Sequence, residues 1–160
     1  MAAIARPAWR HESAPGVRAL RIASLAVTAI GIAAALVAYP SLPAEVPTHV
    51  GVTGEVDAFG PRWTLLVLLA IWAALQVLVA WLSTHPEWGN VPVTITESNA
   101  QPVYREVERT LVLLGVALAV VLAGVVLAVV GLPGQPVIGV GIAGVLAVVV
   151  VGIARIVRAA

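Results

Sequence analysis

Four long apolar runs constrain what this chain can fold into. They cover residues 22–39, 63–82, 110–132 and 137–154, and none of them contains Asp, Glu, Lys, Arg or His. A helix of about 20 apolar residues crosses the hydrocarbon core of a bilayer. Only helices and closed barrels satisfy their backbone hydrogen bonds in lipid, and these runs lack the alternating polarity of barrel strands. The sequence therefore predicts an all-α integral membrane protein with four transmembrane helices.

The composition agrees with this fold class. Hydrophobic residues make up 61% of the chain and charged residues 11%, whereas soluble domains carry about 25% charged residues. A soluble globular protein and a nucleic-acid binder are therefore excluded. The absence of cysteine excludes disulfides, iron–sulfur clusters and thiol catalysis.

The arginines predict the orientation. The chain has nine basic residues, all of them arginine, and Arg62 alone falls in the loop at residues 40–62. The other eight fall in the two terminal segments and in the loop at residues 83–109. Because basic residues stay on the cytoplasmic side, we expect both termini and the second loop inside, and the first loop outside. The expected location is the bacterial cytoplasmic membrane, with the lipid bilayer as the first partner.

The chain is expected to hold one domain. Residues 1–17 are predicted to be a flexible cytoplasmic tail and residues 18–160 a single four-helix membrane domain. The third helix is expected to begin in the cytoplasm at Ala100, with Asn99 as its N-cap. On its juxtamembrane extension, the polar and exposed face is expected to carry most of the charged residues Arg105, Glu106, Glu108 and Arg109. Small-residue ladders on the third and fourth helices are expected to face each other in an antiparallel hairpin, with a homodimer as the alternative: Gly115, Ala119, Ala123; Gly139, Ala143, Ala147.

Catalytic chemistry is not predicted. The sequence has no nucleophile-elbow, zinc-protease or Walker motif, and no cofactor is expected. His49 lies in the outer loop while His11 and His85 lie inside, so His49 cannot share a metal with either of them, and no metal site is expected. The spans also lack the ionisable group that ion-coupled transporters usually hold within the membrane. Gln76 is interpreted as a residue that bonds between helices.

The outer loop carries the most informative motif. Residues 42–49 read Leu-Pro-Ala-Glu-Val-Pro-Thr-His, and residues 54–60 read Gly-Glu-Val-Asp-Ala-Phe-Gly, followed shortly by Arg62. Prolines restrict the backbone and glycines permit tight turns, so this loop is predicted to have a defined shape. A second motif, Asn90-Val-Pro-Val-Thr-Ile-Thr-Glu-Ser-Asn-Ala100 with Tyr104 downstream, lies in the cytoplasmic loop.

Together the two motifs resemble the bacterial membrane family known as domain of unknown function 1648. That domain also forms the N-terminal part of Sdp-type immunity proteins, which protect bacteria from a secreted peptide toxin. The resemblance implies a cell-envelope protein without established enzymology. The positions it singles out are, in the outer loop, Pro43, Pro47, His49, Gly54 and Asp57, and, in the cytoplasmic loop, Pro92, Glu97, Asn99 and Tyr104.

Three functions follow as hypotheses. The first is a ligand-sensing or immunity-like protein, not an enzyme, whose outer loop binds a peptide or another envelope ligand. The second is a small accessory subunit packed against another membrane protein, such as a transporter. The third is a membrane enzyme that acts on lipid, with His49 as its general base.

Overall fold

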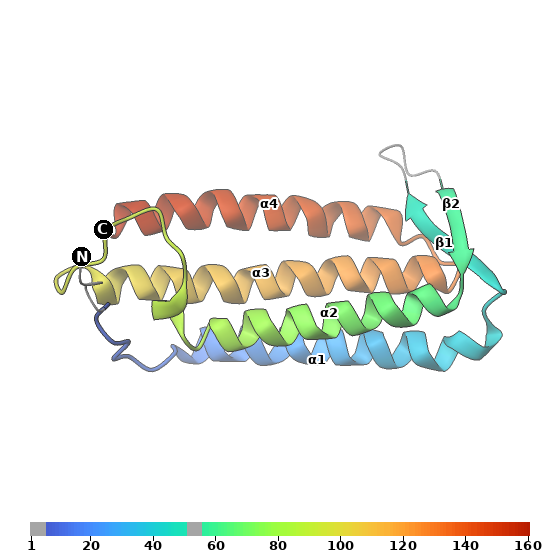
Figure 1. The fold of residues 1–160 in the computed structure, drawn as a ribbon, viewed down its shortest axis with the longest axis horizontal. Coiled ribbons are helices and arrows are strands. Elements are labelled where there is room, and N and C mark those ends of the chain that lie inside the picture. The colour runs from blue at the N-terminus through green and yellow to red at the C-terminus, as the bar shows by residue number, and fades with distance from the viewer. Residues whose placement is uncertain (1–5, 51–55) are drawn as a thin grey trace, which may run out of the picture.

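The computed structural model describes residues 6–50 and 56–160, and it is a bundle of four long helices with a small β-hairpin at one end (Figure 1). All four helices are long and apolar enough to cross a membrane, so the predicted fold class is confirmed. The elements in chain order are α1 Pro15–Ala38, the 3₁₀ turn η1 Tyr39–Ser41, β1 Glu45–Val50, β2 Val56–Pro61, α2 Trp63–Leu82, the 3₁₀ turn η2 Pro86–Trp88, α3 Ala100–Val129 and α4 Gln135–Arg158.

Local sequence explains most helix boundaries. α1 starts at Pro15, seven residues before the predicted span, because proline suits the first helical turn, where its missing N–H costs nothing. α3 ends where Gly131 adopts a left-handed backbone with φ of 79°. Leu132 N–H then bonds to Leu127 O at 2.9 Å and Gly131 N–H to Ala128 O at 3.2 Å, which is a Schellman ending.

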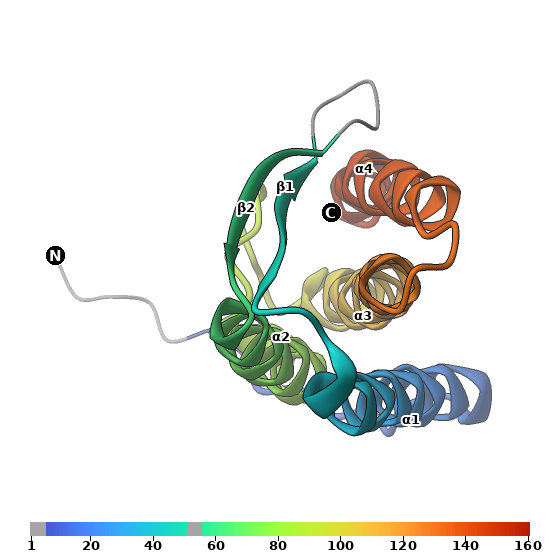
Figure 2. The same ribbon diagram turned by 90° about the vertical axis from the view of Figure 1, so that its right-hand side faces the viewer.

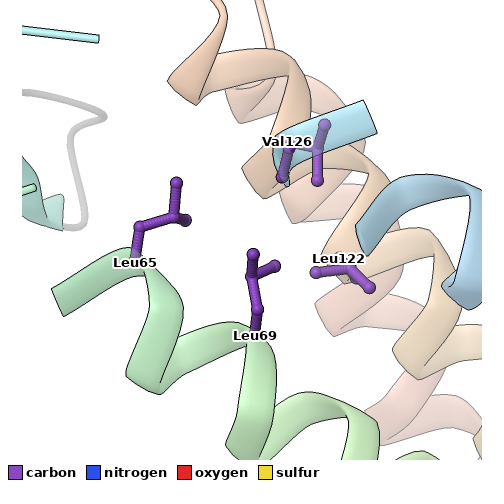
Figure 3. Close-up of a cluster of buried hydrophobic side chains, with 5 residues drawn as sticks. Leu65, Leu69, Leu122 and Val126 are labelled. Atoms are coloured by element: carbon purple, nitrogen blue, oxygen red, sulfur yellow. The ribbon is translucent and has the colours of Figure 1, made fainter. Parts of the chain in front are cut away.

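α3 is the central helix and packs against the other three. One core cluster joins Leu65 and Leu69 of α2 to Leu122 and Val126 of α3, with Ala35 of α1 beside them (Figure 3). α4 packs chiefly on α3, and its outer face presents large apolar side chains such as Leu146 and Val150. Such a face suits lipid contact.

The predicted ladder pairing is wrong in its residues, although α3 and α4 do form an antiparallel hairpin. A Cβ added at Gly115 would meet Gln76 and Ser24 of α2 and α1, while a Cβ at Gly139 would meet nothing within 4 Å. The close approach between α3 and α4 uses Gly124 and Gly141 instead. A Cβ at Gly141 would lie 2.6 Å from Val121 Cγ2. Ladder spacing alone does not specify how each helix is rotated about its axis.

The loop at residues 40–62 contains a β-hairpin that the all-α prediction did not include. β1 and β2 are antiparallel, with Glu45 opposite Pro61 and His49 opposite Ala58, and the register is irregular on both sides of His49. The hairpin and the α3–α4 turn lie at one end of the bundle, and the start of α1 and the C-terminus lie at the other (Figure 1). We call these the hairpin end and the terminal end.

Candidate functional site

Arg62 closes the base of the hairpin. Its backbone N–H donates to Ala44 O at 2.9 Å, and its guanidinium donates to Leu42 O at 3.2 Å. The guanidinium also lies 5.3 Å from the centre of the Tyr39 ring, a cation–π distance. Arg62, the basic residue of the outer motif, therefore ties the start of α2 to the end of α1 and holds both strands in place.

The hairpin brings His49 and Asp57 together. His49 Nδ1 lies 2.5 Å from Asp57 Oδ1, and the two side chains are 66% and 55% exposed. An exposed pair of this kind contributes little to stability, so its groups remain available to a ligand. Pro43 precedes β1, while Pro47 lies in β1, where a two-stranded sheet tolerates its missing N–H. Gly54 falls outside the described residues.

An apolar groove runs beneath the hairpin. Two adjoining cavities of about 170 and 230 Å³ share Pro47 and Thr48 of β1, Leu68 of α2, and Val125 and Val129 of α3. His49 lines the larger cavity, whose far wall includes Ile138 of α4. The hairpin arches from α2 toward α4 across this space (Figure 2). The exposed His49–Asp57 pair therefore lies at the rim of an apolar groove.

The terminal end is closed by a buried ion pair. Arg21 of α1 donates to Glu108 of α3 at 2.7 Å, and their side chains are only 13% and 5% exposed. Ser13 also donates to Glu108, and the Arg21 guanidinium reaches Ser83 O at 3.4 Å. The prediction that Glu108 lies on the exposed face of α3 is therefore wrong. Arg21 and Glu108 lie near the starts of α1 and α3, which run in the same direction, so the two charges reach the same level of the bundle. These positions were a signal in the sequence for this ion pair.

The N-terminal segment packs against α3. Residues 6–14 have no helix or strand, yet Pro7 O accepts a bond from Tyr104 Oη at 2.9 Å and Ala8 O accepts one from Gln101 Nε2 at 2.8 Å. Trp9 adds an edge-to-face contact with the Tyr104 ring. The described part of the expected flexible tail thus lies against the bundle, and Pro15–Val17 belong to α1.

The second motif, at residues 90–104, has both buried and exposed positions. Tyr104 is buried, whereas Pro92 and Glu97 are exposed. Asn99 occupies the predicted N-cap position but makes no capping bond. Its amide instead accepts from Thr96 N–H at 2.8 Å and donates to Thr94 O at 3.0 Å and to Ala160 O at 3.3 Å. Asn99 therefore shapes the loop before α3 and holds the C-terminal residue.

The same loop covers the start of α3. Val91, Val93 and Ile95 pack against a small cluster in which Val103 and Val107 of α3 meet Ile156 of α4. One face of the first turns of α3, which includes Val103 and Val107, is thus buried under the protein's own loop.

Gln76 is a buried polar residue of the second span. Its Nε2 donates to Gly115 O at 3.2 Å, so it bonds between α2 and α3. No group of three or more His, Asp or Glu that could hold a metal occurs among residues 6–50 and 56–160.

The hairpin lies within a segment of the chain that is similar to a known family. Residues 26–74 match the family model described as "Domain of unknown function (DUF1648)". The predicted family resemblance is confirmed over these residues. The DUF1648 segment runs from within α1, through the hairpin, into α2, and so contains Arg62 and the His49–Asp57 pair. The cytoplasmic motif lies outside it.

One curated relative is similar to part of the chain. It is an "Uncharacterized protein" of Archaeoglobus fulgidus, 34% identical over 65 residues that cover 36% of this chain and 36% of the relative. No solved structure matches the chain.

Proposed function

We propose that this chain is a ligand-sensing or immunity-like membrane protein, without enzymatic activity, whose hairpin end receives a peptide or another envelope ligand. The observation that carries the proposal is the His49–Asp57 pair at the rim of the apolar groove beneath the hairpin. A polar, exposed pair next to an apolar groove suits an amphipathic ligand, because polar groups orient it and apolar surface supplies affinity.

The proposed orientation places the hairpin outside the bacterial cytoplasmic membrane. Eight of the nine arginines belong to segments at the terminal end, and Arg62 alone lies at the hairpin end. The positive-inside tendency therefore favours a cytoplasmic terminal end. α3 runs from the groove, which Val125 and Val129 line, to Glu108 at the terminal end. This helix would carry a change at the hairpin to a cytoplasmic partner.

The Sdp-type immunity role is the specific form of this proposal, and protection of living cells tests it. Bacteria that are sensitive to the secreted peptide toxin would produce the chain or its variants at equal levels. We expect survival with the original chain and loss of protection with His49→Ala and with Asp57→Ala.

Glu45→Ala is the matched control, since it removes an exposed carboxylate from the same hairpin outside the pair. Equal protection by all variants would remove the pair from the mechanism. Absence of protection by the original chain would refute the immunity role.

The accessory-subunit function has one observation in its favour, the apolar outer face of α4. Co-purification with a transporter, lost in Leu146→Ser together with Val150→Ser, would support it. Isolation as a stable monomer from its native membrane would count against it.

A further inference from the structure

We propose that a furrow between α3 and α4 at the terminal end binds an anionic phospholipid. Two cavities of about 200 and 440 Å³ open along the seam between these helices. They share Glu106, Arg109 and Arg155, so they form one continuous furrow. The furrow lies at the opposite end of the bundle from the groove beneath the hairpin, and the proposal does not depend on the function proposed above.

The wide part of the furrow carries an excess of positive charge. Arg109, Arg155 and Arg158 line it, and Glu106 is its one acidic residue. Arg109 Nη1 donates to Glu106 Oε1 at 2.6 Å. Arg155 and Arg158 are exposed and make no side-chain hydrogen bond within residues 6–50 and 56–160. Two guanidinium groups are thus left for a phosphodiester, whose oxygens fit their planar donors.

Glu106 adds an acceptor to the same place. Its second oxygen, Oε2, is buried and has no hydrogen-bond partner among the described residues. A buried carboxylate oxygen without a donor is costly. A hydroxyl of a glycerol headgroup is a donor that would satisfy it.

The narrow part of the furrow is apolar. Leu113 of α3 and Ala147, Val148 and Val151 of α4 line it. The small side chain of Ala147 leaves room along the seam, which suits a single acyl chain. Charged and apolar parts are therefore arranged in the order in which a phospholipid presents its headgroup and its chains.

The depth of the arginines agrees with this arrangement. Arg109 directly precedes the third apolar run and Arg155 directly follows the fourth. Both guanidinium groups therefore fall at headgroup level, where basic pockets between membrane helices bind anionic lipids. A general attraction of arginines to the membrane surface is the alternative, and it would not depend on which arginines are present.

Native mass spectrometry of the purified full chain tests the proposal. The probes are dioleoyl phosphatidylglycerol and dioleoyl phosphatidylcholine, each titrated in detergent micelles. We expect tighter binding of phosphatidylglycerol, and a loss of roughly tenfold or more in that affinity for R155Q/R158Q. The matched control R10Q/R18Q removes two exposed arginines near the same end outside the furrow, and we expect a change below about twofold.

A second pair of variants tests the apolar part without a change of charge. Ala147→Trp fills the furrow and should weaken phosphatidylglycerol binding severalfold, whereas Ala143→Trp, one helical turn away and outside the lining of the furrow, should not. Each of four results would overturn the proposal: equal binding of both lipids, equal losses in the two arginine doubles, no effect of Ala147→Trp, or full competition by free glycerol 3-phosphate.

Discussion

The two ends of the bundle treat their polar groups in opposite ways. At the terminal end, Arg21 and Glu108 form a buried ion pair. At the same end, the N-terminal segment is hydrogen-bonded to α3, and the C-terminal residue is hydrogen-bonded to the second loop. At the hairpin end, His49 and Asp57 form an equally direct contact that remains more than half exposed. A buried charge pair becomes costly when it is broken, whereas an exposed pair can exchange partners cheaply. The buried pair therefore suits a structural role, and the exposed pair suits the binding of a ligand.

The largest expected effect would break the closed end. Glu108→Leu leaves the Arg21 guanidinium buried without its carboxylate, and we expect a loss of about 3 kcal/mol in stability. Thermal unfolding of the purified protein in detergent measures it.

The double variant R21M/E108L serves as the control, because it removes both charges. It should recover most of the lost stability. A double variant as unstable as the single one would show that the pair itself does not govern the terminal end.

A smaller effect tests how α4 is held, namely by its seam with α3. Gly141→Leu forces a side chain against Val121 and should cost about 2 kcal/mol. Gly139→Leu, with nothing within 4 Å of its Cβ position, should change stability little. Detergent melting curves distinguish the two, and equal losses would contradict this seam.

The smallest expected effect comes from the removal of one tyrosine hydroxyl, which we compare between the two ends. Tyr104→Phe removes the hydroxyl that donates to Pro7 O and should cost about 1 kcal/mol. It should also speed hydrogen exchange in residues 8–13, measured by mass spectrometry.

Tyr39→Phe at the hairpin end keeps the ring that faces Arg62 and should leave both measurements unchanged. Unaltered exchange in Tyr104→Phe would mean that the N-terminal segment is held by other contacts.

Most of the fold could be predicted from the sequence, because a long apolar run is enough to identify a helix that can span a membrane. The predicted second span, residues 63–82, coincides with α2, and α3 begins at Ala100 as predicted. The length of the apolar run sets the bounds of α2, and the turn-forming residues before Ala100 set the start of α3. The strands were not predicted, since six-residue strands that contain proline carry a weak signal next to four apolar runs.

The candidate site was predictable in its residues and not in its surroundings. The motif singled out His49 and Asp57, and the hairpin joins them. The groove beside them depends on how α2, α3 and α4 are placed around it, which no local pattern encodes. The same reason explains why Gly115 faces Gln76 and not α4.

The fastening of α4 along one seam has a consequence for assembly. α1, α2 and α3 pack on one another through contacts that α4 does not share. α4 packs on this three-helix unit chiefly through its seam with α3. Substitutions on the outer face of α4 can therefore alter what the protein associates with in the bilayer, while residues 26–74, which match the DUF1648 model, stay intact.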